Sequence, residues 1–290
     1  MLNPPSLLEK ITIPTECAAW SARTRREGAC IGFVPTMGAL HEGHLDLVNR
    51  AKAVCDKVVC SIFVNPLQFS NSEDLNNYPR QLERDSELLE SVGCDMLFTP
   101  EKESIFTDFT PTKYDLEGLD EHWEGPSRPG HFQGVVNVVE RLFFYVRPDQ
   151  AFFGEKDRQQ LTILRAMARQ QRWPVTITAC ATVRSEDGLA LSSRNQRLDT
   201  IQRQQATVLY RALKAVEKLA FRSSVEETRK AALAVLESEP KVILDHLGLA
   251  DAETLYPITH WDPTREAIAL IAAQVGPVRL IDNITLHPLV

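Results

Sequence analysis

The feature that most constrains this chain is an alternation of short apolar stretches, rich in β-branched residues, with longer stretches whose apolar side chains recur at helical spacing. The expected strands are residues 31–35, 57–64, 95–99, 151–154 and 175–181, and the expected helices are residues 44–55, 75–92, 133–146 and 157–172. In the first helix, one face is expected to carry His44, Leu47, Val48, Ala51, Val54 and Cys55. Strands that alternate with helices of this length favour βαβ units. We therefore predict an α/β protein with a Rossmann-like parallel sheet flanked by helices.

The second part of the chain has a different pattern. Long helical stretches at 200–221 and 224–237 are followed by short apolar strands at 242–245, 267–271 and 278–281. This change places a boundary near Val183, so we predict one domain over residues 1–182 and a smaller C-terminal α/β domain over residues 183–290. Residues 101–130 are rich in Pro, Gly and Asp without clean periodicity, and we expect an irregular connection or a mobile cover there.

Composition narrows the class of function. The chain has 290 residues, with 32 Lys and Arg against 39 Asp and Glu and a net charge of −7, a balance that argues against nucleic-acid or anionic-lipid binding. No apolar run approaches the ~18 residues of a membrane-spanning helix, and the first residues lack the pattern of a secretory signal. The six cysteines are scattered without a CxxC pair, which favours reduced thiols. The sequence therefore predicts a cytoplasmic enzyme for small molecules, with no nucleic acid and no membrane as partner.

The stretch VPTMGALHEGH, residues 34–44, carries the strongest chemical signal. It follows the first expected strand and leads into a helix, and ligands of α/β sheets bind at this end of the strands. Gly38 and Gly43 allow the backbone to approach a ligand closely, and the unpaired N–H groups of a helix start suit a phosphate. His41 and His44 are three residues apart, so both project to the same side of the first helical turn. The pattern favours anion binding.

Three other interpretations of this stretch are possible. Gly38 and Gly43 have the spacing of half a Walker A loop, but His44 and Leu45 replace the residues that contact phosphate and magnesium. The string from His41 to His44 is one residue shorter than the zinc-protease motif HExxH. The third interpretation is a pair of histidines that only caps or packs a turn. Their place at the mouth of a βα unit favours ligand binding over it.

Longer strings extend the signal over nearly the whole chain. PTMGALHEGH, with HxGH at its end, resembles the pantothenate synthetase (pantoate–β-alanine ligase) family, within a superfamily of nucleotidyltransferases that transfer AMP from ATP. Further matching strings are SIFVNPLQF at 61–69, YPR at 78–80, HFQGV at 131–135, FGEKD at 153–157 followed by Gln159 and Gln160, DGLALSSRN at 187–195 and RLIDN at 279–283. The resemblance implies an ATP- and pantoate-binding catalytic domain over residues 1–182, a lid domain over residues 183–290, and a homodimer formed through the N-terminal domain.

The resemblance also implies the reaction. The pantoate carboxylate attacks the α-phosphorus of ATP to give pantoyl adenylate and pyrophosphate, and β-alanine then attacks this mixed anhydride to release AMP and pantothenate. The expected partners are pantoate and β-alanine, with ATP as co-substrate. Mg²⁺ is expected mainly on the ATP phosphates. Its protein ligands are unknown, because Arg84 and Asp85 stand where some members carry two acidic residues linked to magnesium.

The resemblance gives the site residues their expected roles. The expected catalytic residues are His41, His44, Lys156 and Arg194, with His44 as the proton donor. The residues expected at ATP are Met37, Gly38, Ala39, Leu40, His41, Glu42, Gly43, His44, Gly154, Glu155, Lys156, Asp157, Val183, Leu191, Ser192, Ser193 and Arg194. The residues expected at the substrate are Pro35, Asn65, Gln68 and Gln160, with apolar contacts from Met37 and Phe63. Leu191 and Asn137 depart from the family pattern, which commonly has Met and Thr there.

Two other functions remain possible from the sequence. One is an adenylyltransferase that stops after forming an adenylylated product, and the strings SIFVNPLQF and HFQGV disfavour it. The other is a catalytically silent nucleotide-binding module. That interpretation predicts the loss of His44, Lys156 or Arg194, and all three are present.

Overall fold

The chain divides into two units by its internal contacts. The computed structural model describes residues 8–69 and 72–289. The first unit consists of the chain up to Glu117, Arg128–Gly154 and Ile163–Cys180, and the second of Gly118–Ser127, Glu155–Thr162 and the chain from Ala181 onward. Residues 118–127 and 155–162 thus group with the C-terminal segment, although the predicted first domain runs without a break to residue 182. The assignment of catalytic and lid roles to two domains stays a prediction.

The first unit is built on a six-stranded sheet whose strand pairs are all parallel, as predicted. The order is β1-β4-β3-β2-β5-β6. The strands are β1 (Glu9–Ile11), β2 (Ile31–Thr36), β3 (Lys57–Ile62), β4 (Met96–Phe98), β5 (Gln150–Gly154) and β6 (Thr176–Cys180). Central strands are buried on both faces, because helices cover both, and this explains their unbroken apolar runs.

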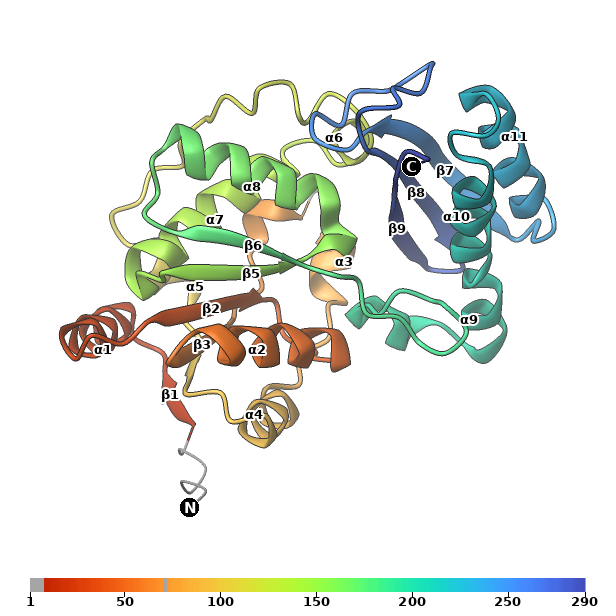
Figure 1. Cartoon of the computed structure of the whole chain (residues 1–290). Coiled ribbons are helices and arrows are strands. Elements are labelled where there is room, and N and C mark those ends of the chain that lie inside the picture. Colours follow the sequence, from red (N-terminus) through yellow and green to blue (C-terminus); the bar gives the residue numbers. More distant parts are fainter. Residues whose placement is uncertain (1–7, 70–71, 290) are drawn as a thin grey trace. The chain divides into compact units, whose positions relative to one another are not determined.

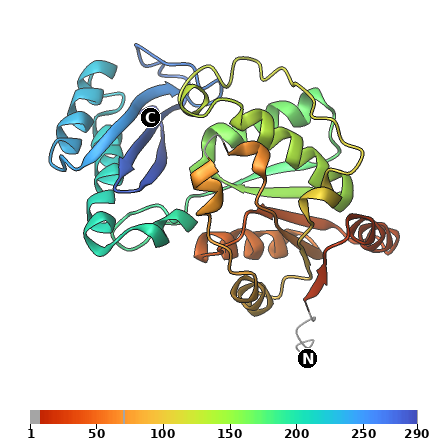
Figure 2. The ribbon, with the colours of Figure 1, turned by 180° about the vertical axis from the view of Figure 1, so that it is seen from behind.

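Helices flank this sheet on both faces. They are α1 (Pro14–Arg26), α2 (Glu42–Val54), α3 (Ser72–Asn76), α4 (Leu82–Ser91), α5 (Lys102–Ile105), α7 (His131–Val146) and α8 (Arg158–Gln170). Figure 1 shows α2 and α4 on one face and α7 and α8 on the other, and Figure 2 shows the same layers from behind. Under α2, the core contains Leu47, Val48 and Ala51 together with Val34 and Val58 of the sheet.

The connections place a topological switch point beside β2. From β2 the chain proceeds through α2 to β3 and then to β4 on one side, whereas β5 and β6 lie on the other side of β2. In an open parallel sheet the crevice for a ligand forms at such a point, outside the carboxyl ends of the strands. The segment that follows β2, residues 37–41, begins at this position.

The second unit contains an antiparallel sheet of three strands, β7 (Val242–Asp251), β8 (Ala267–Val275) and β9 (Val278–Leu286). Its helices are α6 (Glu124–Ser127), α9 (Thr200–Ala206), α10 (Val208–Leu219) and α11 (Val225–Leu236), and its 3₁₀ turns are η2 (Glu155–Asp157) and η3 (Ser193–Arg197). One core joins α10 and α11 to the sheet, with Leu213, Ile271 and Leu280 among its members. A smaller apolar cluster contains Ala250 and Ile268, and Trp123 packs against it.

Some predicted elements differ from the structure. The helix predicted over 75–92 is interrupted between Asn76 and Leu82, because Pro79 lacks an N–H and disfavours helical backbone in the residue before it. The helix predicted over 200–221 is divided at Thr207 into α9 and α10. Val54, predicted on the apolar face of α2, is 59% exposed because it is the last residue of the helix, beyond the packed turns.

The remaining differences concern strands and loops. The edge strand β1 was not predicted, and the C-terminal strands are several residues longer than expected because antiparallel pairing continues past their apolar centres. Within the expected irregular stretch 101–130, only the short helices α5 and α6 form. All six cysteines are free thiols, and five of them are buried. Among residues 8–69 and 72–289, no helix has the length and apolar character needed to cross a membrane.

Candidate active site

The loop between β2 and α2 is held by a carboxylate from α4. Gly38 and Ala39 both have left-handed backbone, with φ of 84° and 51°, and for Ala39 this conformation is strained. The N–H groups of Ala39 and Leu40 donate to Asp85 Oδ2 and Oδ1 at 2.8 and 2.7 Å. Asp85 is only 1% exposed. Its two oxygens therefore fix the backbone that leads into the histidine pair.

The burial of Asp85 has an electrostatic consequence. Removal of the carboxyl from water raises the pKa of Asp85 above its ordinary value, while the N–H groups of Leu40 and Ala39 and the charge of Arg84 lower it by less. The carboxylate is retained because it satisfies two buried backbone donors at once. The sequence prediction had linked this position only to magnesium.

His41 and His44 form a reciprocal cap at the start of α2. His41 Nδ1 accepts from the N–H of Gly43 at 3.2 Å, and His44 Nδ1 accepts from the N–H of His41 at 3.3 Å. The ring centroids lie 4.0 Å apart. Because each Nδ1 accepts a hydrogen bond, the proton of each neutral ring is on Nε2. Both rings therefore have Nε2–H as their donor group.

This arrangement corrects one part of the sequence interpretation. We expected unpaired N–H groups at the start of α2 to receive a phosphate, but six amides of this segment donate hydrogen bonds within the protein. Gly38 donates to Thr36 Oγ1, Ala39 and Leu40 donate to Asp85, and His41, Gly43 and His44 donate within the cap. These bonds leave fewer backbone donors than expected for an anion, and the two histidine side chains add ring N–H donors.

Asn65 and Gln68 lie beside this loop, in a 3₁₀ turn after β3. Asn65 is 1% exposed and caps the turn η1 (Pro66–Gln68), while its Nδ2 donates to Gln68 Oε1 at 3.2 Å. Gln68 Nε2 donates to Met37 Sδ at 2.9 Å. A thioether is a weak acceptor, so a ligand oxygen can replace it at small cost. Pro35 is half-buried at the end of β2, and Phe63 is buried just after β3.

Helix α7 supplies two residues that the sequence prediction missed. His131 is 5% exposed, and its Nδ1 lies 2.7 Å from the carbonyl oxygen of Gln68, so Nδ1–H donates to it. Gly134 lies so close to η1 that an added Cβ would be 2.2 Å from the oxygen of Leu67. Both residues occur in the string HFQGV, whose resemblance to the family was noted without a role for either.

In the second unit, the turn that carries Lys156 is bonded to β9. The turn η2 (Glu155–Asp157) follows Gly154, the last residue of β5. The carbonyl groups of Glu155 and Lys156 accept from Asn283 Nδ2 at 2.9 and 2.8 Å. The Lys156 side chain is only 17% exposed, and its Nζ lies 3.8 Å from Asp157 Oδ1. One turn further along, Gln160 is half-buried on α8.

The segment 183–194 forms a short turn structure in the same unit. The N–H of Leu191 donates to the oxygen of Val183 at 3.0 Å, and Arg184 pairs with Ala190. Ser192 caps η3 by accepting from the N–H of Arg194 at 3.3 Å. Ser193 is 6% exposed, and Arg194 is half-buried.

The predicted site residues therefore form two groups, one in each unit. The first unit brings together Pro35, Met37, Gly38, Ala39, Leu40, His41, Glu42, Gly43, His44, Asn65 and Gln68, and it also contains Gly154. The second unit contains Glu155, Lys156, Asp157, Gln160, Val183, Leu191, Ser192, Ser193 and Arg194. Consecutive residues of β9 connect the members of this second group, because Asp282 binds Arg184 and Asn283 binds the turn of Lys156.

The described residues do not form a ready-made metal centre. No cluster of three or more His, Cys, Asp or Glu side chains suited to a metal ion occurs within 8–69 and 72–289. Asp85, the acidic residue at the position linked to magnesium, has both oxygens engaged with backbone N–H groups. The donor set present does not fit a protein-held magnesium ion at this position.

Comparison with known proteins agrees with this geometry. The family model for pantoate-beta-alanine ligase matches residues 9–285. Pantothenate synthetase of Thermus thermophilus is 48% identical over 265 residues, covering 91% of this chain and 95% of that protein. The corresponding protein of Koribacter versatilis is 47% identical over 264 residues, 90% of each chain.

Solved structures give the same result. The crystal structure of a pantothenate synthetase from Thermus thermophilus has a TM-score of 0.91 at 44% identity and covers 97% of this chain and 100% of its own. Pantoate-beta-alanine ligase from Francisella tularensis, solved in complex with beta-gamma ATP and beta-alanine, has a TM-score of 0.79 at 32% identity and covers 96% and 97% of the two chains. The family predicted from the sequence strings is confirmed, and this chain belongs to the pantoate–β-alanine ligase family.

Proposed function

We propose that this chain is an ATP-dependent ligase that condenses pantoate with β-alanine to give pantothenate, AMP and pyrophosphate through a pantoyl adenylate. The observation that carries the proposal is the family match over residues 9–285. It is supported by the histidine pair at the switch point and by the relative that was solved with beta-gamma ATP and beta-alanine. Its physiological place is the synthesis of pantothenate and, from it, coenzyme A.

In the first step, a carboxylate oxygen of pantoate attacks the α-phosphorus of ATP. The new O–P bond forms as the bond between the α-phosphorus and the bridging oxygen breaks, and pyrophosphate carries the displaced electron pair away. Negative charge therefore grows on the leaving phosphates. We assign its stabilisation to hydrogen bonds from Nε2–H of His41 and His44, because Nδ1 of each ring already accepts a backbone hydrogen bond. The family resemblance gives His44 the further role of proton donor, which requires its protonated form.

The group in the second unit has the chemistry to bind phosphates. Lys156 is a flexible ammonium that can follow the migrating charge, and Ser192, Ser193 and Arg194 offer hydroxyl and guanidinium donors to pyrophosphate oxygens. The proposal further assigns Asp157 to the ribose and Val183 and Leu191 to the nucleotide. These roles rest on the family resemblance of each string.

In the second step, the uncharged amine of β-alanine attacks the acyl carbon of the adenylate. The C–O bond to AMP breaks, AMP leaves with the electron pair, and the nitrogen releases a proton as the amide forms. We assign pantoate to Gln68, Gln160 and Asn65, since carboxamides bind hydroxyl and carboxylate groups without adding charge. The Gln68 amide that now donates to Met37 Sδ is suited to a pantoate oxygen. Pro35, Met37 and Phe63 would contact the dimethyl group.

Magnesium, location and assembly complete the proposal. We assign Mg²⁺ to the ATP phosphates, as part of the MgATP substrate, since Asp85 is engaged by the loop backbone. A cytoplasmic location and a homodimer through the N-terminal domain follow from the family resemblance. Sedimentation of the purified chain tests the dimer: a species of twice the 32.6 kDa chain mass supports it, and a single-chain species contradicts it.

The function is tested by following the two half-reactions separately. With MgATP and pantoate alone, pyrophosphate release is expected, and AMP release is expected only after β-alanine is added. Pyrophosphate without any response to β-alanine would indicate an adenylyltransferase. A folded protein that releases no pyrophosphate would indicate a nucleotide-binding module without activity.

A further inference from the structure

Strand β9 carries two neighbouring buried polar residues that each bind a different segment of the second unit. Asp282 and Asn283 are 4% and 7% exposed. Asp282 accepts two hydrogen bonds from Arg184 at 2.6 and 2.9 Å, and the Arg184 guanidinium stacks over the ring of Tyr210 at 4.2 Å. Asp282 thereby fixes the segment that leads to Ser192.

Asn283 binds the turn of Lys156 through both hydrogens of its side-chain amide. Its Nδ2 donates to the carbonyl oxygens of Glu155 and Lys156, and a primary amide has two such donors. Because the carbonyls belong to successive residues, the two bonds restrain the backbone on both sides of the Lys156 Cα. A side chain that restrains a backbone in this way also limits where the attached ammonium can reach.

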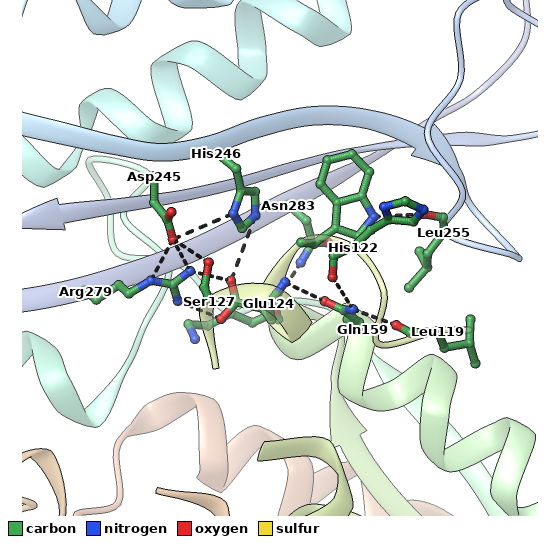
Figure 3. A network of polar contacts seen from close by, with 12 residues as sticks. Leu119, His122, Glu124, Ser127, Gln159, Asp245, His246, Leu255, Arg279 and Asn283 are labelled. Carbon is green, nitrogen blue, oxygen red and sulfur yellow. Dashed lines mark hydrogen bonds and ion pairs between the residues drawn. The ribbon is translucent and has the colours of Figure 1, made fainter. Parts of the chain in front are cut away.

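The residues after Lys156 are restrained to the same unit by further buried contacts. Gln159 is 3% exposed, and its amide donates to the carbonyls of Leu119 and His122 and accepts from the N–H of Glu124. Arg158 Nη2 donates to the carbonyl of Ala252 at 2.9 Å. Figure 3 shows Gln159 within this network together with Asn283.

Strand β9 also binds the 118–127 segment, through the charged side chain of Arg279. Arg279 binds both oxygens of Glu124 at 2.7 and 2.8 Å, and its Nε donates to Asp245 at 3.0 Å. Figure 3 shows Arg279 between these two carboxylates. The 118–127 segment, the turn of Lys156 and the 184–190 segment are therefore all bonded to one strand.

We propose that Asn283 is a positioning residue for Lys156, and that β9 sets the placement of Lys156 relative to the 183–194 segment. This inference rests on the role of Lys156 in the proposed ligase reaction. Asn283 acts through the backbone it holds. Its removal is therefore expected to act on the same step as the removal of the Lys156 ammonium.

The test is a double-mutant cycle with Asn283→Ala, Lys156→Gln and the double variant, with pantoate-dependent pyrophosphate release as the readout. Lys156→Gln is expected to lower kcat by ~10²–10³, and Asn283→Ala by ~10–10², the effect of a displaced catalytic group. If Asn283 acts through Lys156, the double variant is no slower than Lys156→Gln within about twofold. Losses that multiply would overturn the inference.

Two further measurements separate positioning from general stability. Asn283→Ser retains one hydroxyl donor and is expected to be intermediate in kcat between wild type and Asn283→Ala. Thr285→Ala, two residues further along β9 and on the same face, is the matched control and is expected to stay within about twofold of wild type. A control variant as slow as Asn283→Ala would show a structural effect of the strand alone and would overturn the proposal.

Hydrogen exchange keeps the inference testable if the ligase reaction fails. In the intact chain, Asn283→Ala is expected to raise amide exchange in peptides covering 155–160 and to leave peptides covering 37–44 unchanged. If the wild type is inactive but Asn283→Ala still raises exchange at 155–160, the proposed function is rejected and the role of Asn283 in holding the turn of Lys156 is retained. Active wild type with unchanged exchange at 155–160 would reject the anchor alone.

Discussion

The loop after β2 and the turn after β5 occupy equivalent places in two βα units, yet they are secured through opposite backbone groups. In the loop, the Asp85 carboxylate accepts the N–H groups of Ala39 and Leu40. In the turn, the Asn283 carboxamide donates to the carbonyls of Glu155 and Lys156. Each anchor is buried, and each lies far along the chain from the segment that it holds.

This difference shows how each segment is suited to meet an anion. The carboxylate beside the loop occupies two backbone N–H donors, and the neighbouring histidine rings carry Nε2–H groups suited to an anion. The carboxamide beside the turn is neutral, so the anchor itself does not cancel the charge of Lys156. In both segments the anchor binds two neighbouring backbone groups, and we assign the chemistry to the side chains.

The largest effect is expected at His44. Its substitution tests whether the imidazole ring or the backbone of α2 donates to the leaving phosphates. His44→Ala and His44→Gln should each lower pantoate-dependent pyrophosphate release by ~10²–10³, since each loses the imidazole Nε2–H. They should differ in stability. Gln at this position can still accept the N–H of His41, whereas Ala loses the cap at a cost of about 1 kcal/mol. The readouts are single-turnover pyrophosphate release and urea unfolding.

Activity close to wild type in His44→Gln would contradict the role of the ring. It would mean that any cap at this position suffices and that the backbone of α2, rather than the imidazole, stabilises the leaving phosphates.

The next largest effect is expected at Asp85, the anchor of the loop. Asp85→Asn keeps the shape but places an NH₂ group against one of two backbone N–H donors, which leaves that donor unsatisfied at a cost of about 1–3 kcal/mol. The displaced loop should lower kcat for pyrophosphate release by ~10–10². Glu87→Gln, the same chemical change at an exposed position of α4, is the matched control. If both variants behave alike, Asp85 does not hold the loop for catalysis.

Much of the fold could be predicted from the sequence, because strands β2 to β6 and helices α2 and α7 carry local apolar patterns. The site could be predicted only where it lies in contiguous strings, such as residues 34–44. Asp85 and Asn283 show why the rest could not. Each is a single polar residue whose role depends on a partner 46 or 127 positions away in the chain. No local pattern in the sequence indicates such a pairing. In addition, the helix predicted over 75–92 is interrupted, so the buried face of α4 that carries Asp85 could not be predicted from the helical spacing.

At Gly38 an effect on stability is expected, and the part of it that exceeds a control glycine tests whether close packing restricts the loop. Gly38 has φ of 84°, and an added Cβ would lie 2.9 Å from Ile62 Cγ2 and 3.1 Å from Asp85 Oδ2. Gly28 has a similar φ of 79° with nothing within 4 Å of an added Cβ. Gly28→Ala should therefore report the backbone strain alone, about 1 kcal/mol, and Gly38→Ala should lose a further ~1–2 kcal/mol of unfolding free energy. Equal losses in urea unfolding would show that the packing around the loop is not restrictive.

The smallest effect is expected at Asp187, which extends the comparison to an anchor exposed to water. Asp187 precedes Ser192 and Arg194 and is bound by Arg203, and this bond, together with the hydroxyl of Ser185, lowers the pKa of its carboxyl from the ordinary 3.8 to about 2. A carboxyl with a lowered pKa stabilises the fold above its unfolded pKa and loses that contribution as the pH falls through the folded value. Asp187→Asn should therefore lower the free energy of unfolding by less than ~1 kcal/mol at pH 7, the range measured for exposed ion pairs. The difference from wild type in urea unfolding should remain constant down to about pH 5 and shrink between about pH 4 and pH 2. A difference that persists unchanged at pH 2 would mean that the amide disturbs the turn itself. Asp187 would then act as Asp85 does, by holding the backbone of its turn. The two carboxylates would differ in burial and not in the kind of interaction that they make.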